Sequence, residues 1–136
     1  MSSAQNLIYA VIQVVHNFGA VAVVGGSLLA VVLRERPTRK RLAVLTLLGW
    51  LTQAASGATF GLTTLYFDHG LPDISGIATY ALGIKMLCAS LGILLLTAYL
   101  WQGERWKDQQ VHGVWLSSSV LAVTALTSAA FLRWFS

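Results

Sequence analysis

Four long apolar stretches, at residues 7–33, 42–66, 74–100 and 111–132, follow one another along the sequence with short polar segments between them. Each is longer than the roughly 20 residues that an α-helix needs to cross about 30 Å of hydrocarbon. Lys85 is the one Asp, Glu, Lys or Arg residue inside any of these stretches. The pattern predicts an all-α fold, an integral membrane four-helix bundle that forms a single domain over residues 1–136.

Small residues recur at helical spacing inside the apolar stretches. Ala22, Gly26 and Ala30 lie four positions apart in the first stretch, and Gly57 and Gly61 form a GxxxG pattern in the second. Helices in lipid gain little from hydrophobicity and pack where small residues let their backbones approach closely. We therefore expect these positions to form the packing seams of a tight bundle.

The composition and the distribution of charge agree with a membrane protein. Hydrophobic residues make up 56% of the chain and charged residues only 10%, against about 25% in a typical soluble domain. Five of the nine Lys and Arg residues fall within residues 34–41, which is typical of a short loop kept in the cytoplasm and not of a nucleic-acid-binding stripe. We expect Pro37 in this loop to end the first helix.

This charge pattern also predicts the orientation. With residues 34–41 in the cytoplasm, both termini face the periplasm or the cell exterior, and Arg133 is the one cation expected near the outer surface. The expected location is the bacterial cytoplasmic (inner) membrane, with several passes. The expected surroundings are the lipid bilayer and a membrane or periplasmic protein partner, with no nucleic acid.

Lys85 is the first candidate functional residue. It follows Asp73 by about 18 Å of helix, which places it near the middle of the membrane. A lysine at that depth costs at least about 2.5–3.5 kcal/mol, so it marks a functional site unless backbone carbonyls and hydroxyls of the bundle simply satisfy it. Both interpretations remain open from the sequence.

His16 is the second candidate, because it lies about 14 Å inside the first stretch, at nearly the depth of Lys85. Gln13 and Asn17 share its helix face. Its imidazole could bind haem iron or copper, or it could donate a hydrogen bond to a neighbour such as Gln53. The predicted cofactor site therefore contains His16, Lys85, Gln13, Asn17 and Gln53.

A copper site would draw on the soft donors near the middle of the membrane, which are Met86 and Cys88. The candidate metal ligands are then His16, Met86 and Cys88. Because Met86 and Cys88 lie on different faces of one helix, packing roles explain these two better. His112 is expected at the cytoplasmic end, about 15–20 Å in depth from His16, so the two should not share a haem. His69 is expected in the outer loop, either as a solvated turn residue or as a group that helps to receive a metal from the outside.

No hydrolytic or acid–base motif is present. The five acidic residues lie in or beside the connecting segments, no pair of carboxylates falls within an apolar stretch, and no phosphate-binding loop occurs. These features give no support for a hydrolase or for acid–base catalysis by carboxylates.

Residues 16–26, a histidine followed nine and ten positions later by Gly25 and Gly26, resemble the first helix of the CopD-type copper-resistance membrane domain. The Ser56-Gly57 pair looks like the polar segment of that family's second helix, and Tyr80 followed by Lys85 resembles its third helix. More distantly, His16 and Lys85 are similar to positions in the membrane-bound, oxygen-independent protoporphyrinogen oxidases, a family associated with b-type haem. The resemblance implies a membrane bundle built around a histidine and a lysine, with copper or haem chemistry.

Three functions follow as hypotheses. The first is a CopD-like protein that handles copper, or supports a copper-dependent system, through the polar site near His16 and Lys85. The second is a b-type haem-binding redox protein or oxidase-like subunit, with His16 as axial ligand and Lys85 paired with a carboxylate. The third is a structural subunit of a membrane complex, held by its small-residue seams.

Overall fold

The computed structural model describes residues 2–70 and 76–135 as four long helices. These are α1 (Ser3–Val32), α2 (Arg36–Asp68), α3 (Ile77–Gln102) and α4 (Asp108–Phe135), with a short 3-10 turn η1 (Gly103–Arg105) before α4. No strand occurs within the described ranges. All four helices are long and apolar enough to cross a membrane. The predicted all-α bundle is therefore confirmed.

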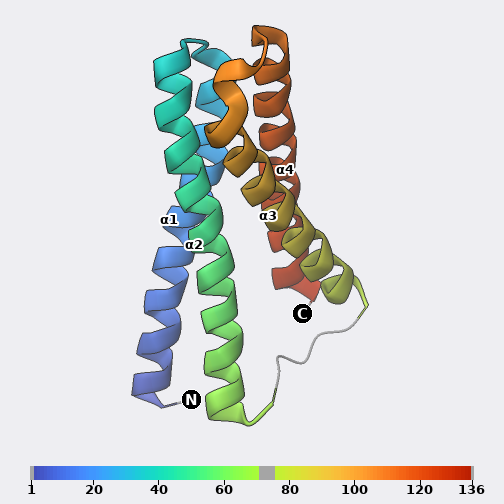
Figure 1. Cartoon of the computed structure of the whole chain (residues 1–136). Helices are drawn as coiled ribbons and strands as arrows, with labels where there is room; N and C mark the ends of the chain where they lie inside the picture. Colours follow the sequence, from blue (N-terminus) through green and yellow to red (C-terminus); the bar gives the residue numbers. More distant parts are fainter. Residues whose placement is uncertain (1, 71–75, 136) are drawn as a thin grey trace.

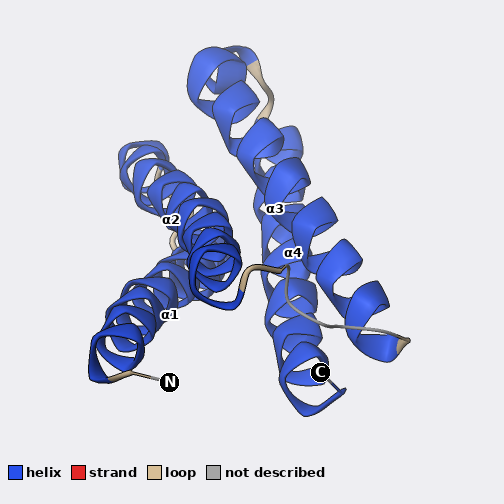
Figure 2. Cartoon of the chain, turned by 90° about the horizontal axis from the view of Figure 1, so that it is seen from below, coloured by secondary structure: helices blue, strands red, loops and turns tan. Residues whose placement is uncertain are grey.

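The helices alternate in direction, so the bundle has two distinct ends (Figure 1). Both chain termini lie at one end, which we call the termini end. The α1–α2 and α3–α4 connections lie at the opposite end, which we call the turn end. Figure 2, seen from the termini end, shows α1 and α2 as one antiparallel pair and α3 and α4 as a second pair. The fold is thus two helix hairpins placed side by side.

The segment between α1 and α2 is shorter than the sequence predicts. Residues 34–41 do not form a loop, because α2 already begins at Arg36 and Pro37 lies in its first turn. A proline is tolerated there, since the first backbone N–H groups of a helix have no intrahelical acceptor. The prediction that Pro37 ends the first helix is therefore wrong, and most of the basic cluster lies on the first turns of α2. The helices also extend a few residues beyond the predicted starts, at Ser3 for α1 and Asp108 for α4.

Arg39 ties three helices together at the turn end. Its side chain is buried, and its Nε donates to the carbonyl oxygen of Ala30 at 2.9 Å. Ala30 belongs to the last turn of α1, where carbonyl groups lack an intrahelical donor. The Nη2 atom of Arg39 also lies 2.9 Å from Nδ1 of His112 on α4. An exposed ion pair between Arg36 and Asp108, at 2.7 Å, adds a second link between α2 and α4.

Close contacts in the middle of the bundle join the two hairpins. The indole of Trp50 on α2 is buried against Gly92 on α3, where a Cβ atom would lie only 2.5 Å from the ring. The hydroxyls of Ser27 on α1 and Ser118 on α4, both fully buried, form a 2.8 Å hydrogen bond. Small or polar residues at these crossings let α2 approach α3 and α1 approach α4.

Some of the small residues predicted to form packing seams lie at helix contacts, and others do not. Gly26 and Ala30 of α1 are buried at helix contacts, as predicted. By contrast, a Cβ atom added at Gly57 or Gly61 would meet nothing within 4 Å. The GxxxG pattern of α2 therefore does not serve as a packing seam within this chain. Toward the termini end the hairpins diverge (Figures 1 and 2), and the residues that line the space between them form the candidate site.

Candidate functional site

A cavity of about 740 Å³ lies between the two hairpins, and all four helices contribute to its wall. Most of the wall is apolar, with Trp50 and Phe60 from α2 and a run of alanine and leucine side chains from α4. The polar side chains that line it are Gln13, His16, Asn17, Gln53, Ser56, Lys85 and Arg133. The predicted cofactor residues therefore all line one cavity, together with two that were not predicted.

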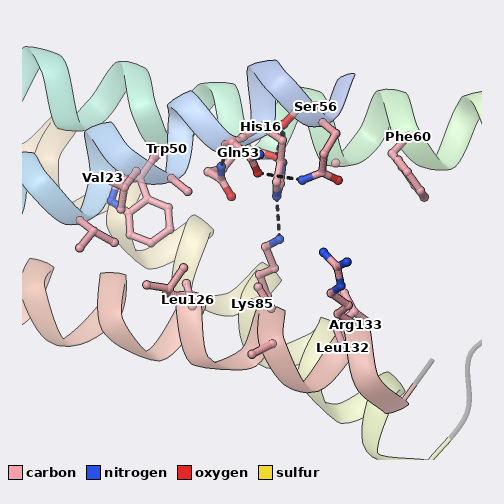
Figure 3. A pocket seen from close by; sticks show the side chains of 18 of the residues that line it. His16, Val23, Trp50, Gln53, Ser56, Phe60, Lys85, Leu126, Leu132 and Arg133 are labelled. Atoms are coloured by element: carbon pink, nitrogen blue, oxygen red, sulfur yellow. Dashed lines mark hydrogen bonds between the residues drawn. The ribbon is translucent and has the colours of Figure 1, made fainter. Parts of the chain in front are cut away.

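His16 and Lys85 meet directly inside this cavity. The Nζ atom of Lys85 on α3 lies 2.9 Å from Nε2 of His16 on α1 (Figure 3). Both side chains are only partly buried, because the cavity opens between the hairpins. The two residues lie at a common level and point toward one another from opposite hairpins. Their positions along the first and third apolar stretches predict this common level.

The other ring nitrogen of His16 contacts a serine on α2. Nδ1 lies 2.6 Å from Oγ of Ser56, and the same oxygen lies 2.6 Å from the carbonyl oxygen of Thr52. Because the Ser56 hydroxyl donates to that carbonyl, its oxygen accepts from Nδ1–H of His16. The imidazole then carries its proton on Nδ1, and the Nε2 lone pair faces the cavity, where the Lys85 ammonium donates to it.

Ser56 is the positioning residue that the sequence interpretation missed. It is 6% exposed, and its bond to His16 links α1 to α2. The sequence contains a pattern that could have indicated Ser56 as a site residue: Gln53 and Ser56 are three positions apart, so they share a face of α2. Gln53 also contacts His16, but it donates to the backbone carbonyl of His16 and not to its ring.

Gln13 and Asn17 lie on the α1 side of the cavity. The Gln13 amide donates to Oδ1 of Asn17 at 2.8 Å, and both side chains are exposed at the cavity mouth. They share the helix face of His16, as predicted, and they add hydrogen-bonding capacity beside it without holding its ring.

Met86 and Cys88 do not join His16. Met86 is 62% exposed on the outer surface of α3, and Cys88 is buried in the bundle core, so neither lines the cavity. Within the described residues, no group of three or more His, Cys, Asp or Glu side chains is placed to hold a metal ion. The structure therefore does not assemble the ligand set His16, Met86 and Cys88.

The other two histidines lie away from the cavity. His112 contacts Arg39 at the turn end, and Arg39 and Ser56 are separated by about 25 Å along α2. His69 follows the last residue of α2, in a left-handed backbone conformation with a φ of 55°. His16 is consequently the histidine of the cavity.

Arg133 is the second residue that was not predicted for the site. The sequence suggested only a cation near the outer surface, but its side chain lines the cavity from α4. Figure 3 shows its guanidinium extending into the same space as the Lys85 amine. None of the described residues that line the cavity is Asp or Glu. The wall therefore combines apolar side chains with polar ones, two of which, Lys85 and Arg133, are basic.

Comparison with known proteins finds no family model, no curated protein and no solved structure that matches this chain.

Proposed function

We propose that this chain is an integral membrane protein that binds a b-type haem in the cavity between its hairpins, with His16 as axial ligand. One observation carries the proposal: Nδ1 of His16 is held by Ser56, so that Nε2 faces the cavity. Histidines that bind metals usually donate their other ring N–H to an oxygen acceptor in this way. The Ser56 contact thus orients His16 as a metal ligand before any metal arrives.

The donor set favours haem over an ion held by protein side chains alone. A copper or zinc ion needs several protein donors, whereas the described residues that line the cavity offer one imidazole and no sulfur. A haem brings four nitrogen donors of its own, and a single proximal histidine completes many haem sites. His16 alone is therefore sufficient for haem and insufficient for a closed copper site.

The size and lining of the cavity fit the same proposal. Its volume of about 740 Å³ falls within the roughly 300–1,000 Å³ of cofactor and ligand sites. The apolar wall would exclude water from a porphyrin face, and Lys85 is placed to pair with an acidic group once it leaves His16. The chain has a single cysteine, Cys88, which lies outside the cavity, so covalent attachment of a haem is not supported.

Bound haem would supply one-electron redox chemistry, as a redox protein or oxidase-like subunit would require. The residues of this chain would hold and orient it: His16 as ligand, Ser56 as the group that fixes the ring, and Lys85 as counter-charge. The described residues that line the cavity include no pair of carboxylates. Ser56 and His16 are in hydrogen-bond contact, but the Ser56 hydroxyl donates to the Thr52 carbonyl and accepts from the imidazole, so His16 does not serve it as a base.

Copper handling is the second candidate, and the orientation of His16 favours it as well. The resemblance to the CopD family at His16, Gly25, Gly26 and Lys85 points in the same direction. Because the described lining of the cavity supplies one good donor, copper would be bound transiently, or a donor from a partner protein would complete its coordination.

An absorption spectrum tests the proposal. The chain is expressed with haem supply and purified in detergent, and wild type is expected to show a Soret band that His16→Ala loses. His69→Ala, which removes an imidazole outside the cavity, is the control and should keep the band. Copper bound by wild type and lost in His16→Ala, without a Soret band, would favour the second candidate. A Soret band unchanged in His16→Ala would refute His16 as the ligand.

We further propose that the protein spans the bacterial inner membrane with the turn end in the cytoplasm. The exposed cations Arg34, Arg36, Lys40, Arg41, Arg105 and Lys107 gather at the turn end. Arg133 alone lies near the termini end among the described Lys and Arg residues. This asymmetry supports cytoplasmic turns and outward-facing termini.

A further inference from the structure

A second hollow lies at the turn end, outside the cavity between the hairpins. It is a groove of about 530 Å³ between the first turns of α2 and the end of α3, both of which lie at the turn end in Figure 1. Its apolar part is formed by Pro37, Tyr99 and Leu100, and its charged part by Arg36, Lys40 and Glu104. None of these residues is among those that line the cavity of His16. The groove is therefore separate from the site of the proposed function.

The charged residues of the groove already have partners. The Arg36 guanidinium donates to the Asp108 carboxylate at 2.7 Å and to the carbonyl oxygen of Trp106 at 2.8 Å. Lys40 forms an ion pair with Glu104 at 3.3 Å. Because these pairs neutralise both carboxylates, the excess positive charge beside the groove comes from other residues.

Arg41 and Arg105 supply this excess charge. Both residues are exposed, and neither forms an ion pair or a side-chain hydrogen bond with any residue that the structure describes. Arg41 lies four positions after Pro37, so the two share a face of α2. Arg105 follows Glu104 directly in η1. One cation therefore flanks the groove on each side, from α2 and from η1.

An exposed apolar surface continues from the groove toward the middle of the bundle. Val44 and Leu48 lie three and seven positions after Arg41 on the same helix, and both are exposed. At the end of α3, beside Leu100, Trp101 is 83% exposed, as is typical of an aromatic ring at a membrane interface. Two cations thus adjoin an apolar strip, an arrangement that matches a molecule with an anionic head and an apolar tail.

We propose that the turn end binds an anionic phospholipid of the surrounding leaflet. The headgroup phosphate lies between Arg41 and Arg105 at the mouth of the groove, and an acyl chain lies along Val44 and Leu48. Basic pockets between membrane helices bind anionic headgroups in this way, and the guanidinium fork matches the oxygens of a phosphate. A zwitterionic lipid carries an ammonium of its own, which the two arginines repel. The site therefore selects lipids by their net charge.

The test compares two lipids with the same acyl chains, dioleoyl phosphatidylglycerol and dioleoyl phosphatidylcholine. Each is titrated into the purified full-length chain in nonionic detergent, and bound lipid is counted by native mass spectrometry. Wild type should bind phosphatidylglycerol at least about tenfold more tightly, since two cations act on its charge. Arg41→Gln and Arg105→Gln should each weaken this binding about fivefold, the factor that about 1 kcal/mol for one cation produces. Neither variant should change the affinity for phosphatidylcholine.

Arg34→Gln is the matched control, because Arg34 is an exposed arginine at the turn end that belongs to neither α2 nor η1. It should change the affinity for phosphatidylglycerol by less than about twofold, since salt limits the reach of a single surface charge. Glycerol phosphate, a soluble anion without acyl chains, should not displace the lipid at equal concentration. Helix content by circular dichroism checks that each variant is folded.

Three outcomes overturn the inference. Equal affinity for the two lipids would show that the headgroup charge is not recognised. An equal loss in Arg34→Gln and Arg41→Gln would show a diffuse attraction and not a site at the groove. Displacement by glycerol phosphate would show a site for soluble anions and not for lipid. None of these measurements involves haem, so their failure and the failure of the proposed function are independent.

Discussion

Replacing Gly92 by alanine tests the contact that holds the two hairpins together. A Cβ atom at Gly92 would lie 2.5 Å from Cε2 and Nε1 of Trp50 and 2.9 Å from Cδ2. Carbon atoms pack at about 3.5–4.0 Å, so the methyl group is about 1 Å too close. Trp50 is 1% exposed, and its ring is a rigid body without a flexible end. The substitution therefore forces α2 and α3 apart or displaces the indole.

Two opposing effects decide the size of the change in stability. Overpacking a tight interface costs about 1–3 kcal/mol. Alanine also favours the helix over glycine by up to about 1 kcal/mol. Gly83 lies on the same helix, and a Cβ atom added there would meet nothing within 4 Å. Gly83→Ala therefore gains the helix propensity of alanine without overpacking. The difference between the two variants therefore isolates the clash and is expected to be about 1–3 kcal/mol, with Gly92→Ala less stable.

The free energy of unfolding is measured by titrating the detergent-solubilised protein with a denaturing detergent, for wild type and both variants. Helix content by circular dichroism checks that each variant folds before titration. If Gly92→Ala were as stable as Gly83→Ala, Trp50 would not pack on Gly92, and the placement of α2 against α3 would be wrong. Since Trp50 also lines the cavity, Gly92→Ala should weaken any ligand binding there as well.

Two further predictions concern the bundle. In a double-mutant cycle, Ser27→Ala and Ser118→Ala should show a coupling energy of about 0.6 kcal/mol and at most about 1.7 kcal/mol, the range of interhelical hydrogen bonds in membrane proteins. A control cycle that pairs Ser27→Ala with Ser117→Ala, whose hydroxyl bonds within its own helix, should show no coupling. Absence of coupling between Ser27 and Ser118 would contradict the contact between α1 and α4. An alkaline phosphatase reporter, which is active only outside the cytoplasm, should be active when fused after Phe135 and inactive when inserted between Arg105 and Asp108; the reverse pattern would refute the proposed orientation.

Much of the fold follows from local properties of the sequence. Whether a stretch is long and apolar enough to cross a membrane depends on that stretch alone. The four stretches can therefore be identified without knowledge of their tertiary contacts. The meeting of His16 and Lys85 was also predictable, because polar side chains at one depth in lipid have few other groups to bond with. Helix ends were less predictable: Pro37 marks the start of α2 and not the end of α1, since proline suits the first turn of a helix.

Which residues share the cavity was decided by the tertiary structure. Ser56 holds His16, Arg133 enters from α4, and Met86 faces outward, although none of these placements can be deduced from depth alone. Depth along a helix is a local quantity, but the face that a residue presents depends on the rotation and crossing of all four helices. Those are set by contacts between residues far apart in the sequence, such as Trp50 on Gly92. The sequence by itself therefore determined the four spans and the level of the polar groups, and the packing of the bundle decided which of them face one another.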